Sequence, residues 1–126
     1  MKVNFERLVW THSIPADPVV WVSVNAIDAS WQHDKGLYVG PGGKGGTDNR
    51  YAFFGEWLAA NLHRPVQVPE IGLSRGEVVF SNGRHRFAWF RDRGLPVLPV
   101  AVDPAIVEPF RARFTTPRRV GRLRRA

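Results

Sequence analysis

A strand, a tight turn and a helix are predicted in the first part of residues 77–102, which have the sequence EVVFSNGRHRFAWFRDRGLPVLPVAV. Residues 77–80 are mostly β-branched or aromatic, as is typical of a strand. The next three residues, 81–83, have turn composition, and Gly83 can adopt a positive φ without steric penalty. Residues 84–93 contain good helix formers and no helix breaker.

The same stretch ends in a second strand. Gly94 stands where a left-handed residue commonly ends a helix, and Pro96 follows two residues later. Residues 98–102 are apolar enough to form a buried strand. The predicted order is therefore strand, turn, helix, turn and strand.

An anion site is predicted at the start of this helix, at Gly83, Arg84, His85 and Arg86. A helix start has unpaired backbone N–H groups and carries the positive end of the helix dipole. Two arginines and a histidine would strengthen such a site, and phosphate is the anion they favour. They also repel the positive end of the dipole, so helix stability alone would not select them. A basic surface turn beside a core helix is the alternative, and spacing alone favours neither.

Residues 83–102, GRHRFAWFRDRGLPVLPVAV, resemble the signature of the ParB/sulfiredoxin-like superfamily. The signature is a glycine followed by His-Arg at a helix start, then a glycine and a Pro-Val strand; the resemblance covers mainly residues 66–102. It implies an α/β (α+β) domain with a small mixed sheet and helices packed against it. It also implies that nucleotide or nucleic-acid phosphate binds at Gly83, Arg84, His85 and Arg86, and it leaves the reaction open.

Cysteine is absent from the chain of 126 residues. In the resemblance, Arg84 falls where sulfiredoxin has its reactive cysteine, so sulfinic acid reductase chemistry is excluded. The composition, 44% hydrophobic, can form one small core. No run approaches the length of a membrane span and the start lacks the shape of a signal peptide, so a cytoplasmic protein is expected.

The remaining segments predict further elements of a small mixed fold. A strand is predicted at 19–24, and a short helix at 25–31. Residues 1–10 predict either a strand or a short helical turn. Residues 66–73 contain Pro69, which favours an edge strand or two short pieces. Turn 74–76 follows, and Asp103-Pro104 starts the last helix.

A helix is predicted at about residues 49–62. Four of its side chains share one face at helical spacing and are predicted to enter the core: Tyr51, Phe54, Leu58 and Leu62. Trp57 lies off that face and either flanks a cleft or, as the favoured interpretation, extends the core. Arg50, near the helix start, is a candidate to reach a ligand or is simply solvated.

Five glycines and a proline within residues 40–46 exclude regular structure there. No Walker pattern can be aligned to this loop. One interpretation is a mobile flap that brings backbone amides and Lys44 to a bound phosphate. The other is a flexible surface loop, which loop statistics alone favour.

The net charge of +7 comes entirely from the end of the chain. Residues 111–126 contain seven arginines and no acid, whereas residues 1–110 contain eleven basic and eleven acidic residues. We divide the chain into a domain, 1–114, and a basic, flexible tail, 115–126. The tail predicts contact with nucleic acid, although a solubilising, disordered end is the alternative. The arginines proposed for this contact are Arg118, Arg119, Arg122, Arg124 and Arg125.

Whether the protein is an enzyme is left open by the sequence. His85 and Glu70 are the candidate catalytic residues. A nucleotide-dependent ATPase or kinase would also need Mg²⁺ bound by carboxylates. Those available are Asp28, Asp34, Asp48 and Glu70, and nothing ranks them.

Three classes of function follow. The first is a ParB-like, nucleic-acid-associated protein, with or without nuclease activity, and the arginine-rich tail favours it. The second is an ATPase or kinase acting on small molecules. The third is a non-enzymatic accessory or inhibitor protein of a plasmid or phage on the same fold.

Overall fold

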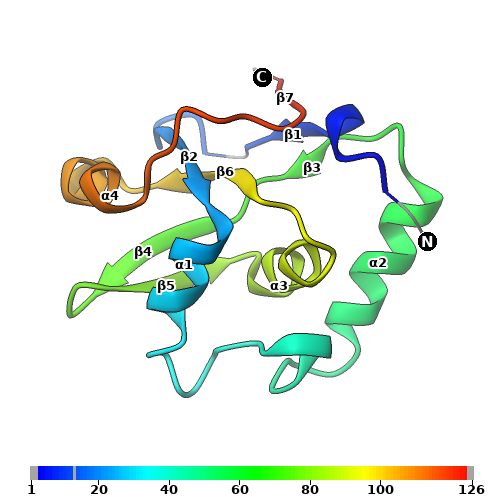
Figure 1. Ribbon diagram of the computed structural model, residues 1–126, viewed down its shortest axis with the longest axis horizontal. Helices are drawn as coiled ribbons and strands as arrows, with labels where there is room; N and C mark the ends of the chain where they lie inside the picture. Colours follow the sequence, from blue (N-terminus) through cyan, green and yellow to red (C-terminus); the bar gives the residue numbers. More distant parts are fainter. Residues whose placement is uncertain (1–2, 13, 125–126) are drawn as a thin grey trace.

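Two β-sheets contain the strands of the protein (Figure 1). The computed structural model describes residues 3–12 and 14–124. Within that part of the chain, one sheet has the strand order β2-β6-β4-β5 and the other the order β3-β1-β7. The strands are β1 (Val9–Thr11), β2 (Val19–Ser23), β3 (Val66–Gln67), β4 (Glu70–Ser74), β5 (Glu77–Asn82), β6 (Val97–Val102) and β7 (Arg122–Leu123).

Helices cover the sheets and one another. They are α1 (Val24–Trp31), α2 (Arg50–Ala60), α3 (Arg84–Asp92) and α4 (Val107–Phe114), with 3-10 turns η1 (Phe5–Arg7), η2 (Pro41–Gly43) and η3 (Pro104–Ile106). Helix α1 contacts β2 and β5, and α4 contacts β2. Helix α2 packs against α3 on the side of the molecule opposite α4 (Figure 1). No helix among the described residues has the length and apolar character needed to cross a membrane.

Strand β6 is the centre of the core, since all six of its residues are buried. It pairs antiparallel with β2 and parallel with β4. Because both neighbours and both faces are occupied, its sequence VLPVAV needs no polar alternation. Aromatic rings fill the space between this sheet and the helices, and Phe90 packs against both Trp10 and Phe54.

The predicted α/β fold and its strand, turn, helix and strand order are confirmed. The segment with Pro69 forms two short pieces, β3 and β4, which belong to different sheets. The first ten residues include both predicted forms, the turn η1 followed by the start of β1. One core prediction is wrong: α2 ends at Ala60, and Leu62 beyond it is 57% exposed.

The predicted flexible tail is also wrong for residues 115–124, which pack on the body of the protein. Strand β7 pairs in parallel with β1, and the indole N–H of Trp10 donates to the carbonyl of Val120 at 3.1 Å. Val120 is buried. This segment has too few apolar residues to fold alone, but the edge of β1 supplies backbone partners that composition does not reveal. Arg125 lies outside the described residues.

Candidate phosphate-binding groove

A glycine with a positive φ starts helix α3. Gly83 has φ +84° and is the N-cap of the helix, and in the described structure no side chain caps that end. A β-bulge precedes it, because Glu70 pairs with Asn82 whereas Ile71 pairs with Phe80. Bulges re-aim the chain next to functional sites. Within the residues described, the backbone N–H groups at the first turn of α3 therefore have neither a partner in the preceding helix turn nor a side-chain cap.

The two arginines of this turn have different environments. Arg84 extends to the loop that precedes α2, donating to the carbonyl of Leu37 at 2.8 Å and to Oγ1 of Thr47 at 2.6 Å. Arg86 folds back beneath the turn, where its Nε donates to the carbonyl of Gln67 at 3.1 Å. Its Nη2 is buried and has no hydrogen-bond partner within residues 3–12 and 14–124. Burial lowers the pKa of Arg86, and the charge of Glu70 partly opposes the shift.

His85 is buried and accepts a backbone hydrogen bond. The N–H of Thr47 donates to its Nε2 at 3.0 Å, so the neutral ring carries its proton on Nδ1. Burial lowers the pKa of His85 below its ordinary value of 6.5, and the charges of Arg84, Arg50 and Arg86 lower it further. At neutral pH this residue is therefore an uncharged hydrogen-bond donor, not a cation.

Acid is expected to destabilise the protein through His85. As the pH falls through 6.5, the unfolded chain takes up a proton before the folded protein does, because the folded pKa is lower. The free energy of unfolding should decrease by at most about 1.4 kcal/mol per pH unit between pH 6.5 and the lowered pKa. Below the lowered pKa it should level off. Urea unfolding, monitored by circular dichroism at pH values from neutral to acid, measures this dependence of the free energy of unfolding on pH. A His85→Gln variant should lack this component, and equal pH slopes in both proteins would contradict the assignment.

The glycine-rich loop is packed against α3. The N–H of Gly42 donates to Oδ2 of Asp92 at 2.9 Å. A Cβ at Gly43 would lie 2.7 Å from the ring of Tyr51, and one at Gly46 would lie 3.1 Å from the ring of His85. In the structure the loop thus packs against α3 and α2, whereas both interpretations of its composition, a mobile flap and a flexible surface loop, expected it to be loose. Lys44 lies exposed in a turn of this loop.

A groove of ≈ 530 Å³ runs between α2 and the start of α3. Its lining brings together five of the predicted phosphate-binding residues: Gly83, Arg84, His85, Arg86 and Arg50. Lys44 and Glu70 are not among the lining residues. Arg50 is exposed and makes no side-chain hydrogen bond within the described structure, so its guanidinium can meet a ligand. Within the described part of the chain, the lining contains no carboxylate.

The four candidate Mg²⁺-binding carboxylates make separate contacts. Oε2 of Glu70 accepts from Nδ2 of Asn82 at 3.1 Å; Asn82 lines the groove, whereas Glu70 does not. Asp28 pairs with Arg91 at 3.0 Å, Asp48 is exposed, and Oδ2 of Asp34 is buried without a hydrogen bond. Residues 3–12 and 14–124 contain no group of three or more metal-ligating side chains. None of the four candidate carboxylates is among the described residues that line the groove.

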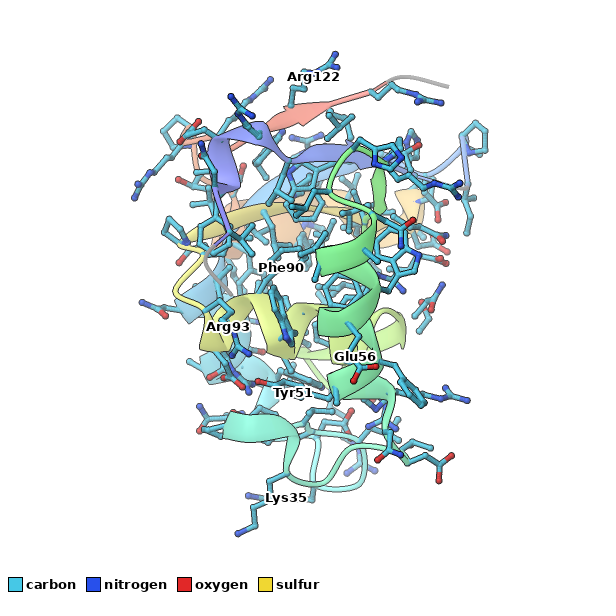
Figure 2. All side chains as sticks on the ribbon, turned by 90° about the vertical axis from the view of Figure 1, so that its right-hand side faces the viewer. Lys35, Tyr51, Glu56, Phe90, Arg93 and Arg122 are labelled. Carbon is cyan, nitrogen blue, oxygen red and sulfur yellow. The ribbon has the colours of Figure 1, made fainter. Side chains whose placement is uncertain are left out.

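The arginines of the C-terminal segment lie on a different part of the surface. None of Arg118, Arg119, Arg122 and Arg124 lines the groove among the residues described. Arg119 lies over the ring of Trp21, 5.8 Å from its centroid. Figure 2 shows Arg122 at the top of the molecule and Tyr51, which belongs to the first turn of α2, in its lower half. The excess charge and the groove are two separate features.

Phe53 is among the groove residues that sequence reasoning missed. Its ring is 58% exposed, and that of Trp57, one helical turn further, is 38% exposed. The available signal was their spacing from Arg50 at i+3 and i+7, which places all three on one side of α2. Phe54 and Leu58, on the neighbouring face, are buried as predicted. Trp57 thus flanks a cleft, the less favoured of its two interpretations.

Comparisons with known proteins give a fold. No family model matches the sequence, and no curated protein matches it. The structure is similar to a crystal structure of Oncogenic Suppression Activity Protein, a plasmid fertility inhibition factor, with a TM-score of 0.65 and 19% sequence identity. The match covers 82% of this chain, which spans 60% of that one. That neighbour has the ParB/sulfiredoxin-like fold, so this chain shares its fold with a distant structural neighbour of that class.

Proposed function

We propose that the groove between α2 and α3 binds the phosphate groups of nucleic acid. The observation that carries the proposal is a groove lined by Arg50, Arg84 and Arg86 at an uncapped helix start, with no acid among its described lining residues. A helix start and arginine side chains both favour phosphate oxygens. None of the described lining residues adds a negative charge to this positive field, and Glu70, beside Asn82, acts on Arg86 from outside the lining.

Each basic residue has a distinct part in this proposal. The exposed guanidinium of Arg50 contacts phosphate directly, because no hydrogen bond within the described protein holds it. Arg84 and Arg86 supply positive charge from fixed positions, since each already donates to a backbone carbonyl. Neutral His85 has one remaining N–H to donate.

A binding role without turnover is favoured over nuclease, ATPase or kinase activity. Phosphoryl transfer and metal-assisted hydrolysis need carboxylates that hold a metal or accept a proton. The described lining has none, and Glu70 is engaged outside it. The structural neighbour is a plasmid fertility inhibition factor, which is compatible with an accessory or inhibitory role. Release of nucleotides from an oligonucleotide in the presence of Mg²⁺ would favour the nuclease alternative.

Replacing Arg50 with alanine is expected to weaken nucleic-acid binding and its dependence on salt. Loss of one phosphate contact should reduce the slope of log K against log salt by about one. Anisotropy of a labelled oligonucleotide, titrated from about 50 to 200 mM salt, measures both quantities. Inorganic triphosphate as a competitor tests whether free phosphate chains occupy the same groove.

Arg111→Ala provides the matched control. Arg111 is exposed on α4, at the opposite side of the molecule from α2 (Figure 1), and its loss removes the same charge. It should leave the slope nearly unchanged. Equal effects of the two variants would argue against the groove, and a larger effect of Arg118→Ala or Arg122→Ala would assign phosphate binding to the C-terminal segment instead.

A further inference from the structure

Helix α2 presents two exposed aromatic rings to the groove. Arg50, Phe53 and Trp57 follow one another at three- and four-residue spacing, so they form a stripe along one side of the helix. All three line the groove. The neighbouring face, with Phe54 and Leu58, is buried against the core. Core packing therefore accounts for one side of α2, and on the other side it leaves Phe53 58% and Trp57 38% exposed.

Exposed apolar side chains gather at this groove. Within the described residues, five large hydrophobic side chains are exposed: Ile14, Leu37, Phe53, Trp57 and Leu62. Three of the five, Leu37, Phe53 and Trp57, line the groove. The most exposed of them all is Phe53, at 58%. A cluster of apolar groups beside convergent cations indicates a ligand with both a flat apolar part and negative charge.

We propose that Phe53 and Trp57 stack against unpaired bases of a single-stranded nucleic acid whose phosphates contact Arg50 and the start of α3. The proposal rests on the function proposed above and adds the form of nucleic acid that is bound. Every base has a π-face, so stacking on aromatic side chains selects single strands with little sequence preference. In a duplex, adjacent bases cover these faces, and a duplex can offer the groove only its phosphates.

The Trp57 ring is held in place by contacts within α2. Trp57 packs on Phe54 with ring centroids 6.0 Å apart and an interplanar angle of 26°, which supports one side of the indole. The backbone carbonyl of Trp57 accepts from Nδ2 of Asn61 at 2.8 Å, which supports the last turn of α2. Four residues of helix separate the rings by about 6 Å along the axis, and Arg50 lies one turn earlier. A nucleic-acid strand that runs along α2 from its N-terminal end would thus contact Arg50 first and the two aromatic rings afterwards.

A protein partner is a weaker explanation of the same surface. An apolar segment would fit Phe53 and Trp57, but it would also have to bring acidic groups to Arg50 and Arg84, since the described lining offers no acid of its own. A nucleic-acid strand supplies both requirements in every nucleotide. We therefore argue for the strand and treat the protein partner as a result that the experiment below would reveal.

Binding of three nucleic acids separates stacking from phosphate contact. The ligands are an oligothymidylate of about twelve nucleotides, an abasic strand of the same length and a duplex of that length. Wild-type protein should bind the oligothymidylate on the order of tenfold more tightly than the abasic strand. Phe53→Ala and Trp57→Phe test the two rings, the second because it retains a smaller aromatic platform. Both positions are partly solvent-exposed, and circular dichroism verifies that the variants fold.

Phe53→Ala should lose most of the preference for base-bearing strands while keeping its affinity for the abasic strand, and Trp57→Phe should lose less. Leu62→Ala, an equally exposed apolar side chain just beyond the same helix, should change neither. Equal wild-type affinity for abasic and base-bearing strands, or tighter binding of the duplex, would overturn stacking and leave the proposed phosphate function intact. Failure to bind any of the three ligands would overturn both and leave the protein partner as the explanation.

Discussion

Replacing Gly83 with alanine is expected to lower the free energy of unfolding by about 2–5 kcal/mol and to abolish binding in the groove. The left-handed conformation, φ +84°, costs a residue with a Cβ about 1–2 kcal/mol. The new Cβ would lie 2.7 Å from Nη2 of Arg86 and 2.9 Å from Cα of Pro69. The Cα of Pro69 is a backbone atom and cannot move aside as a flexible side chain would. The steric overlap therefore adds about 1–3 kcal/mol to the loss of stability. Urea unfolding and oligonucleotide anisotropy measure the two effects.

The variant Gly94→Ala separates the backbone cost of a positive φ from the steric clash of the new Cβ. Gly94 ends the same helix with φ +85°, and none of the described atoms lies within 4 Å of a Cβ built there. This variant should lose only the conformational part, about 1–2 kcal/mol, and should bind as the wild type does. Equal destabilisation by the two alanines, or full binding by the Gly83 variant, would show that close packing under Gly83 does not shape the groove.

Replacing Arg91 with alanine is expected to destabilise the protein by about 3–5 kcal/mol, because it leaves two carboxylates beside one another without their cation. The Arg91 side chain is only 9% exposed, and it donates to Asp92 at 2.9 Å and Asp28 at 3.0 Å. Its Nη1 also donates to the carbonyl of Val39 at 2.7 Å, just before the glycine-rich loop. Urea unfolding measures the loss of stability.

The same variant should release the glycine-rich loop. Asp92 links this loop and α2 to α3, since its Oδ2 accepts from the N–H of Gly42 and from the hydroxyl of Tyr51 at 2.6 Å. Burial raises the pKa of Asp92, but hydrogen bonds from Tyr51, Arg91 and Gly42 outweigh it and leave the pKa below 3.8. Hydrogen exchange at Gly42 should therefore become faster in the Arg91 variant.

Arg93→Ala is the control for Arg91. Arg93 is exposed two residues further along, and its guanidinium lies 4.7 Å from the centroid of the Trp89 ring, a contact worth about 0.5–1 kcal/mol. Figure 2 shows Arg93 near the end of α3, beside the labelled Phe90. If Arg91→Ala lost no more stability than Arg93→Ala, the buried ion pairs would not hold the loop.

Much of the fold could be predicted because its signals are local. The strand, glycine turn and helix around Gly83 depend on neighbouring residues, and so does the buried run at 98–102. Leu62 was wrongly assigned to the core because the helical spacing of apolar residues continues in the sequence beyond Ala60, where the helix ends. The tail was misjudged because strand β7 owes its order to pairing with β1, about 110 residues away in sequence.

The candidate site could be predicted only in part. Resemblance and the helix start placed Gly83 to Arg86 together, and they line one groove with Arg50. Lys44 and Glu70 were chosen for their charge and their position in sequence, and they lie outside its lining. Phe53 was missed because sequence does not distinguish an aromatic ring turned to solvent from one turned to the core.

By itself, the sequence determined where the backbone must turn at a glycine, which residues begin the third helix and that thiol chemistry is excluded, since these depend on residue identity and near neighbours. Only the tertiary structure decided that α2 sets two exposed rings beside those arginines, that His85 accepts from Thr47 and that the C-terminal segment packs on β1. These relations join residues distant in the chain, and their geometry follows from how the whole core packs.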